Sequence, residues 1–339
     1  GISRRSFIRS ATASAVALAV APTLGSTESR LNRHETSIIV DGLGFPGGMG
    51  TEPGTPLSSE QVADIRASGL TATHLTVGPV GTMPTTESYA QTTRGIAFWN
   101  SEIAANPDAL ALVLNIADID LAKAGGRTGL IYGMQDGVAF ETELSRLDAL
   151  HGFGIRIVQP TYNRRNLLGD GCMEPANAGL SRSGHEAIER MNAVGILVDL
   201  SHCGRQTAAD AIAISSKPVA FTHAGCAALV DHPRHRTDDE LRAVAATGGV
   251  TGIYVMPYLT GGRQPAAADV VRHLLHAIDV CGEDHVAVGT DGGISPVDLT
   301  PEYKEAFRSN IILRRESGIA APGETEEGYL FASDLNKPD

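Results

Sequence analysis

Three side chains that can bind a metal ion or move a proton each follow a short run rich in β-branched residues. They are His202, His223 and Asp291. If these runs are parallel strands, their carboxyl ends meet at one edge of the sheet, and the three side chains converge there. Imidazole is a good zinc ligand, and bound zinc lowers the pKa of a water molecule to about 7. The pattern predicts a metal site for hydrolysis, with Asp291 as a further ligand or as the group that moves the proton.

Other polar side chains follow neighbouring runs. Gln135 and Asp136 come after the third run, and Tyr162 and Asn163 after the fourth. Arg234 lies in a loop beyond His223, and its guanidinium fork matches a carboxylate with two hydrogen bonds. We therefore predict Gln135 and Asp136 as further metal ligands, and Arg234, Tyr162 and Asn163 as substrate-binding residues. A surface arginine is the alternative interpretation of Arg234.

The elements that must position these residues alternate along the chain. Eight runs are predicted strands, at 37–41, 71–77, 129–134, 155–160, 196–200, 218–222, 250–255 and 285–289. Seven helical patterns are found at 58–68, 108–124, 142–151, 183–194, 204–214, 238–246 and 267–281. Eight strands that alternate with helices favour an α/β fold of the (β/α)8 (TIM) barrel type over a doubly wound sheet. After the eighth strand we expect an irregular tail with a weak helix at 301–317, and a barrel that stops before its last helix.

The beginning of the chain has the pattern of an export signal. Arg4 and Arg5 precede Phe7 and Ile8, and an Ala-rich apolar run follows at 11–21. A positively charged segment followed by a short apolar one is typical of secretion, and the paired arginines resemble a twin-arginine signal. We expect residues 1–30 to be this signal, residues 31–339 to form one barrel domain, and the protein to be periplasmic or secreted.

Composition excludes several classes of function. The 339 residues hold 27 Lys+Arg against 39 Asp+Glu, a formal net charge of −12, which argues against a nucleic-acid partner. No run of about eighteen apolar residues occurs, so we expect no transmembrane segment. Of the four cysteines, Cys203 and Cys226 follow the two candidate metal histidines, where a disulfide, soft metal ligands and small buried side chains all remain open. A homodimer is also left open.

A glycine-rich segment after the first strand suggests a different chemistry. The spacing Gly42, Gly44 and Gly47 matches GxGxxG, the pattern that binds the pyrophosphate of a dinucleotide. That site needs a helix to begin directly after the glycines, whereas here Pro46 and a Gly/Pro-rich loop follow. An oxidoreductase is therefore a distant third interpretation.

Several stretches, taken together, resemble the membrane (renal) dipeptidase family of zinc-dependent barrels. They are Gln159-Pro-Thr-Tyr-Asn-Arg-Arg-Asn-Leu-Leu-Gly-Asp-Gly-Cys172, Asp199-Leu-Ser-His202, Pro218-Val-Ala-Phe-Thr-His223, Asp231-His-Pro-Arg234 and Asp284-His-Val-Ala-Val-Gly-Thr-Asp291. The resemblance implies a hydrolase that cleaves dipeptides with a pair of zinc ions bridged by a carboxylate. It implies His202 and His223 as ligands of one zinc, Asp291 as the acid/base group and Arg234 as the residue that holds the substrate's carboxylate.

The sequence departs from the family pattern at the other zinc ion. The family begins with Asp-Gly-His-x-Asp, where this chain has Leu43 and Phe45 in place of the two ligands. The bridging glutamate corresponds to Gln135, unless Asp136 substitutes for it, and a histidine on the substrate side corresponds to Tyr162. Leucine and phenylalanine bind no ion, so we expect one zinc ion at most.

Two functions therefore remain from the sequence. The first is an exported hydrolase with one metal ion that cleaves a dipeptide or a similar small amide. The second is a dipeptidase-like protein without peptidase activity, which binds a peptide-like ligand or modifies it without hydrolysis and without metal. Leu43, Phe45 and Gln135 favour the second function, whereas His202, His223, Asp291 and Arg234 together favour the first.

Overall fold

The computed structural model describes residues 36–47, 54–81 and 85–336. Contacts within the chain separate residues 1–37 from a compact unit, Ile38–Asp339, which contains all the strands and helices named below. The predicted export signal lies outside the described residues. No helix in the described part of the chain is long and apolar enough to cross a membrane.

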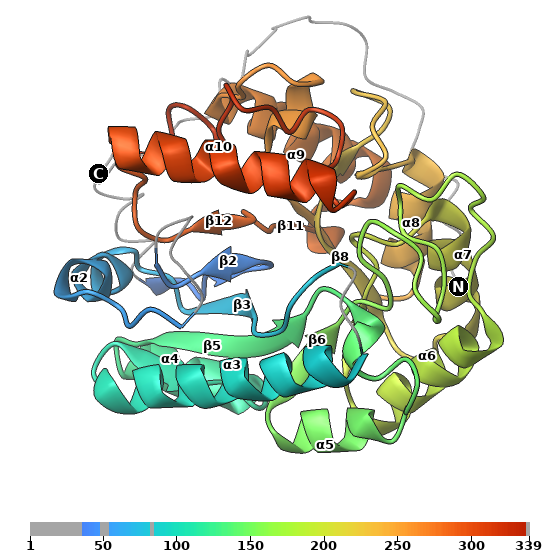
Figure 1. The fold of residues 1–339 in the computed structure, drawn as a ribbon, viewed down its shortest axis with the longest axis horizontal. Coiled ribbons are helices and arrows are strands. Elements are labelled where there is room, and N and C mark those ends of the chain that lie inside the picture. The colour runs from blue at the N-terminus through green and yellow to red at the C-terminus, as the bar shows by residue number, and fades with distance from the viewer. Residues whose placement is uncertain (1–35, 48–53, 82–84, 337–339) are drawn as a thin grey trace, which may run out of the picture. The chain divides into compact units, whose positions relative to one another are not determined.

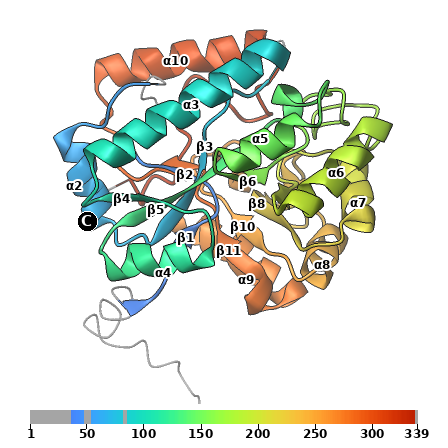
Figure 2. The ribbon, with the colours of Figure 1, turned by 90° about the horizontal axis from the view of Figure 1, so that it is seen from below.

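Eight parallel strands form a nearly closed barrel in the compact unit. In spatial order they are β1 (Val40–Asp41), β3 (Ala72–Thr76), β5 (Thr128–Met134), β6 (Ile155–Val158), β7 (Leu197–Asp199), β8 (Val219–Cys226), β10 (Thr251–Ile253) and β11 (Val286–Val288). The N–H of Gly42, just after β1, donates to the carbonyl of Val288 in β11 at 2.9 Å, which joins the first strand to the last. Figure 2 shows the strands in the middle and helices around them. The predicted (β/α)8 fold and its eight strands are confirmed.

Helices follow the strands at most of the predicted positions. They are α2 (Ser59–Ala67), α4 (Ile116–Ala124), α5 (Arg146–Gly152), α6 (Arg182–Val194), α7 (Arg205–Ile214), α8 (Asp238–Ala246), α9 (Ala267–Cys281) and α10 (Pro301–Glu316). Their ends follow from local chemistry, because Ser58 and Thr237 begin α2 and α8 with capping boxes. Gly195 ends α6 in the left-handed conformation. Figure 1 shows α10 above β12.

In the described part of the chain, the sequence interpretation missed one long helix, one strand of three residues and three two-residue strands. α3 (Thr85–Ala105) has 21 residues, and β4 (Leu110–Leu112) pairs with β5 within the stretch predicted as a helix at 108–124. α3 is rich in Thr and contains Gly95, both of which lower the local tendency to form a helix. A Cβ at Gly95 would lie 2.0 Å from the carbonyl oxygen of Val77, so the glycine permits this close approach to the end of β3. Tertiary packing therefore outweighs local propensity here.

Short strands join the loop after β1 to the loop after β11. β2 (Gly44–Phe45) pairs in parallel with β12 (Gly292–Gly293), and the N–H of Asp291 donates to the carbonyl of Leu43 at 2.8 Å. The glycine-rich segment is thus part of a two-stranded pair, and among the described residues the next helix begins at Ser59. The residues described here therefore place no helix N-terminus directly after the glycines, where a dinucleotide site needs one.

Candidate functional site

The structure brings together His202, which lies just after β7, and His223, which lies in the second half of β8. Both side chains are buried, with exposed fractions of 4% and 0%. Their Nε2 atoms lie 3.0 Å apart. The ring of Tyr162 stacks on His202 with 4.0 Å between the ring centroids. Two histidines that are 21 residues apart in the sequence therefore point their Nε2 atoms at each other.

The hydrogen bonds behind the two rings determine their tautomers. His202 Nδ1 lies 2.6 Å from Asn163 Oδ1, which can only accept, so this nitrogen carries the proton. His223 Nδ1 lies 2.8 Å from the Thr222 hydroxyl, whose own proton is donated to Asp199 Oδ2 at 2.6 Å. Burial, aided by the nearby Arg234, holds the pKa of both imidazoles well below the usual value. Both rings are therefore neutral, with the lone pair on Nε2.

Two Nε2 lone pairs that face each other at 3.0 Å repel, and a cation bound by both nitrogens would remove this repulsion. Neutral imidazole with its other nitrogen held by a hydrogen bond is the usual form of a histidine that binds zinc. The residues present thus fit one metal ion on the side of the two histidines. Among the described residues, no group of three or more His, Cys, Asp or Glu side chains is placed to hold a metal. Among the described residues of these four types, the two imidazoles are therefore the groups that face each other for a metal ion.

Gln135 and Asp136, which were predicted as ligands, have other partners. Gln135 Nε2 donates to the Thr76 hydroxyl at 2.9 Å. Asp136 is buried, and its Oδ1 and Oδ2 accept hydrogen bonds from the Asn166 amide and the Gly81 N–H, both at 3.0 Å. Asp136 thus connects three loops around the barrel mouth. The structure does not bring it together with His202 and His223 in a group that could hold a metal.

Asp291 lies at the end of β11 in the left-handed conformation, with φ 54°. Burial raises the pKa of its carboxyl to about 7, although Arg234 and Arg314 act in the opposite direction. A carboxyl group with a pKa near neutrality can both take up and release a proton at physiological pH. The predicted acid/base residue therefore has suitable electrostatics.

Arg234 is buried with 1% of its surface exposed. Its Nη1 donates to the carbonyl of Ser201 at 2.8 Å, and its Cζ lies 5.7 Å from the ring centroid of Tyr254. Among the described residues, no carboxylate forms an ion pair with it. A buried guanidinium is costly unless an anion pairs with it, so this geometry favours a ligand carboxylate over the surface role.

Three further residues of the site escaped the sequence interpretation. The hydroxyl of Tyr254 is buried and has no hydrogen-bond partner among the described residues. The pKa of Tyr254 is raised by burial and lowered by Arg234, which lies close by. Arg314 donates to the hydroxyl of Tyr162 at 3.3 Å and pairs with the buried Glu324. No local motif marks these residues, because Tyr254 lies in a predicted strand and the other two in the predicted irregular tail.

The cysteines take the simplest of the roles left open. All four are free thiols, and Cys203 and Cys226 are buried. Burial raises the pKa of both thiols to about 12, so neither is a thiolate near neutral pH. They pack as small apolar side chains.

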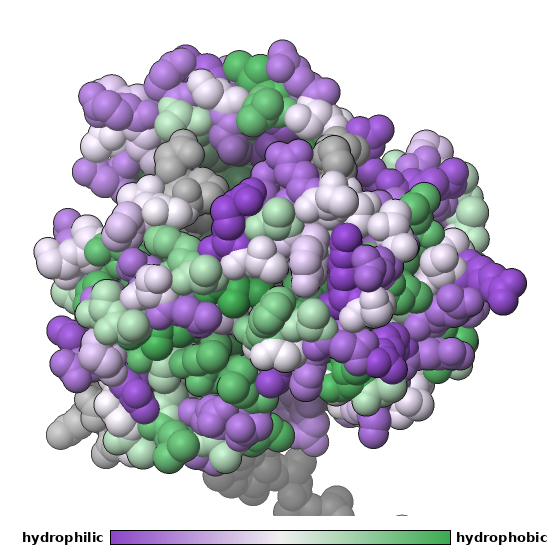
Figure 3. Space-filling model, turned by 60° about the horizontal axis from the view of Figure 1, so that its bottom comes forward, coloured by the Kyte–Doolittle hydropathy of each residue, from purple (hydrophilic) through white to green (hydrophobic). Residues whose placement is uncertain are grey.

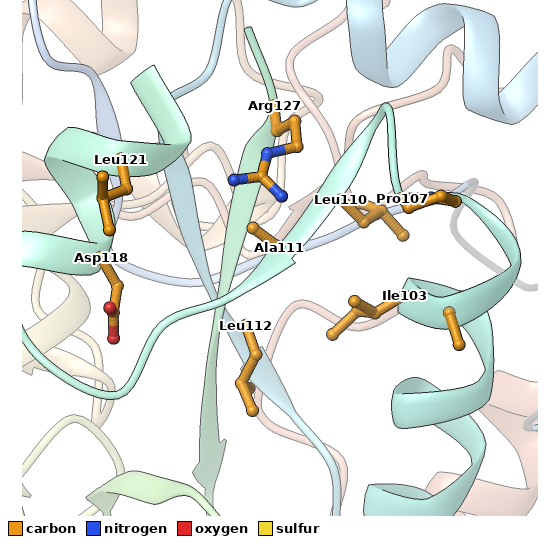
Figure 4. A pocket seen from close by; sticks show the side chains of 9 residues that line it. Ile103, Pro107, Leu110, Ala111, Leu112, Asp118, Leu121 and Arg127 are labelled. Atoms are coloured by element: carbon orange, nitrogen blue, oxygen red, sulfur yellow. The ribbon is translucent and has the colours of Figure 1, made fainter. Parts of the chain in front are cut away.

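A separate pocket of about 340 Å³ lies on the outside of the barrel. Figure 4 shows its lining between α3, β4 and α4, with Leu110, Leu112 and Leu121 among the apolar side chains and Asp118 and Arg127 as the charged ones. On the face shown in Figure 3, apolar side chains gather mainly in the lower left part of the view. This pocket is made by other elements than β7, β8 and β11, which carry the histidines and Asp291.

Comparison with protein families shows which family this chain matches. Residues 55–302 match the family described as membrane dipeptidase (peptidase family M19). The chain is 31% identical over 207 residues to dipeptidase verJ of Clonostachys rogersoniana, a match that covers 60% of this chain and 53% of the relative. It is 35% identical over 152 residues to dipeptidase tcpJ of Claviceps purpurea, covering 43% of this chain and 36% of the relative. The matches thus span about half the length of these relatives, or less.

Solved structures show the same fold. An amidohydrolase from Pseudomonas aeruginosa superposes with a TM-score of 0.76 and 31% identity, covering 91% of this chain and 87% of the other. A metallo peptidase from Rhodobacter sphaeroides, liganded with a phosphinate mimic of the dipeptide L-Ala-D-Ala, has a TM-score of 0.65 at 19% identity and covers 80% of this chain and 93% of its own. The second likeness concerns the fold alone.

Proposed function

The chain belongs to the membrane dipeptidase family, peptidase family M19, and from this premise we propose that it is a metal-dependent hydrolase of dipeptides or similar small amides. The observation that carries the proposal is the pair of Nε2 lone pairs of His202 and His223, 3.0 Å apart, beside the buried Arg234. A dipeptide has a carboxylate within a few ångströms of its only peptide bond. A cation site would take the carbonyl of that peptide bond, and the nearby guanidinium of Arg234, which lacks an anion, would take the carboxylate.

Each residue of the site has a distinct part in this reaction. His202 and His223 would hold one zinc ion, which when bound supplies a Lewis acid for the peptide carbonyl and for water. Arg234 would bind the substrate's carboxylate, and the hydroxyl of Tyr254 is placed to donate a second hydrogen bond. Asp291 would take a proton from the attacking water and pass it to the leaving amine nitrogen as the C–N bond breaks. Tyr162 holds the His202 ring in place by stacking.

The residues after β1 support a single ion. Leu43 is completely buried, and Phe45 packs against the hydrophobic core, so neither position offers a ligand. These same residues favour the second candidate function, a protein that binds a peptide-like ligand without cleaving it. The two candidates differ in one property, turnover of a dipeptide in the presence of metal.

A metal titration combined with a hydrolysis panel tests the proposal. We expect the purified protein to bind about one zinc ion per chain and to hydrolyse dipeptides with a free carboxylate, but not the same dipeptides capped as C-terminal amides, because Arg234 then lacks its partner. Metal analysis and release of free amino acids are the measurements. Zinc binding without turnover of any dipeptide would contradict the hydrolase, and absence of both would favour the metal-free binding protein.

We also propose that the protein is exported by the twin-arginine pathway, on the basis of Arg4, Arg5 and the apolar run that follows. Cell fractionation after expression with its own N-terminus checks this, and a purely cytoplasmic protein would contradict it.

A further inference from the structure

A short segment after α10 covers the candidate site. This segment, residues 318–324, is called the cap below. The carbonyl of Ile319 accepts a hydrogen bond from Asn163 Nδ2, and the carbonyl of Pro322 accepts one from His232 Nε2, both at 2.8 Å. Asn163 is the residue that holds His202, and His232 is two residues before Arg234. The cap therefore crosses from the metal-binding histidines to the carboxylate-binding arginine.

One carboxylate holds the cap in place. The side chain of Glu324 has no exposed surface. Its oxygens accept two hydrogen bonds from Arg314, at 2.6 and 2.9 Å, one from the hydroxyl of Tyr258 at 2.7 Å and one from the N–H of Ala321 at 2.9 Å. Arg314 also reaches the hydroxyl of Tyr162, which stacks on His202. Glu324 thus links the cap to α10 and, through Tyr258 and Arg314, to the walls of the site.

The cap has the properties of a segment that can open. Gly318 and Gly323 have φ of 68° and 90°, the left-handed region that glycine enters without strain. Between them only Ala321 is fully buried, so little apolar surface holds the cap down. Meanwhile His202, His223 and Arg234 are all at least 96% covered in this arrangement. Of the segments near these side chains, the cap combines two left-handed glycines with little buried apolar surface, so it is the segment expected to move when a ligand enters.

We propose that the cap is a size-selecting lid latched by Glu324, which closes over a substrate of two residues and excludes longer peptides. The substrate in this inference rests on the proposed hydrolase function. The latch rests on the hydrogen bonds of Glu324 alone. One end of the cap is held by Asn163, the partner of His202, and the other by His232, two residues before Arg234. The closed lid thus spans the groups that would hold the scissile carbonyl and the carboxylate of a dipeptide. A third residue would have to pass through the cap.

Hydrogen exchange of the cap amides tests the latch without any activity. Glu324→Gln removes the charge that Arg314 binds, and we expect exchange of the Ala321 amide and its neighbours to become about tenfold faster, because hydrogen bonds to a charged group are stronger than those to a neutral amide. The matched control is Glu326→Gln. Glu326 forms an ion pair at the surface with Arg315 of α10, the helix that also carries Arg314. Equal exchange in the two variants would overturn the latch.

Substrate length tests the lid. We expect Glu324→Gln to raise the ratio of kcat/KM for a tripeptide to that for the corresponding dipeptide by about tenfold, while Glu326→Gln leaves the ratio unchanged. A ratio that is the same in all three proteins overturns the size selection. If the unaltered protein cleaves no dipeptide, the proposed function fails, and the exchange experiment still decides whether Glu324 holds the cap. Tyr258→Phe removes only the hydroxyl that contacts Glu324, and should speed exchange in the same direction if Glu324→Gln does not fold.

Discussion

Replacing both His202 and His223 by alanine is expected to abolish zinc binding and to lower kcat/KM for a dipeptide by at least about 10³-fold. The loss of a Lewis acid worth several kcal/mol of transition-state stabilisation gives this magnitude. The structure directs the Nε2 lone pairs of these two histidines at each other, and each is kept available by a hydrogen bond on Nδ1. Zinc content and steady-state kinetics are the measurements.

A buried histidine elsewhere provides the control for that experiment. His273 is also fully buried, but its Nδ1 accepts from the N–H of Cys226, and its Nε2 donates to the carbonyl of Leu259. His273→Ala should lower the thermal stability and leave zinc stoichiometry unchanged. If the double variant at His202 and His223 still bound one zinc ion per chain, the metal site would lie elsewhere in the molecule.

Asp291→Asn is expected to lower kcat by about 10²–10⁴-fold, the usual contribution of a positioned acid/base group, while zinc binding is retained. Asparagine has nearly the same shape but takes up no proton. Above neutral pH, the thermal stability of the variant should be no lower than that of the unaltered protein. Burial raises the pKa of Asp291 to about 7, so above this pH the unaltered protein carries a buried negative charge that asparagine removes. A stable, zinc-loaded and nearly inactive variant is the expected result.

The pH profile adds an independent readout for Asp291. The carboxyl must be ionised to take a proton from water, so kcat of the unaltered protein should decline as the pH falls below the pKa. A bound cation lowers a carboxyl pKa, which places this decline at or below about pH 7. The residual activity of Asp291→Asn should lack the decline. If the substitution left kcat intact, another group would be the proton carrier.

Much of the barrel could be predicted from the sequence alone. All eight strands lie where β-branched runs end in polar loops, because a strand buried on both faces has a local signature that needs no knowledge of its partners. His202, His223 and Asp291 could be placed at the same edge for a related reason, since parallel strands put their carboxyl ends together. α3 could not be predicted, because its Thr-rich sequence is helical only through packing against the end of β3.

The chemistry of the site was decided by contacts between distant parts of the chain. The proton on His202 Nδ1 is fixed by Asn163, 39 residues away, and Asn163 is bound by the cap, 156 residues further on. Asp136 follows its strand as a metal ligand would, yet Asn166 and Gly81 hold its oxygens elsewhere. A sequence pattern reports the type of a residue and its place on an element. Which atom faces which partner depends on side-chain hydrogen bonds that exist only after the chain has folded. These bonds turn the Nε2 atoms of His202 and His223 toward each other, leave the buried Arg234 without an ion-pair partner among the described residues, and tie Glu324 to Arg314.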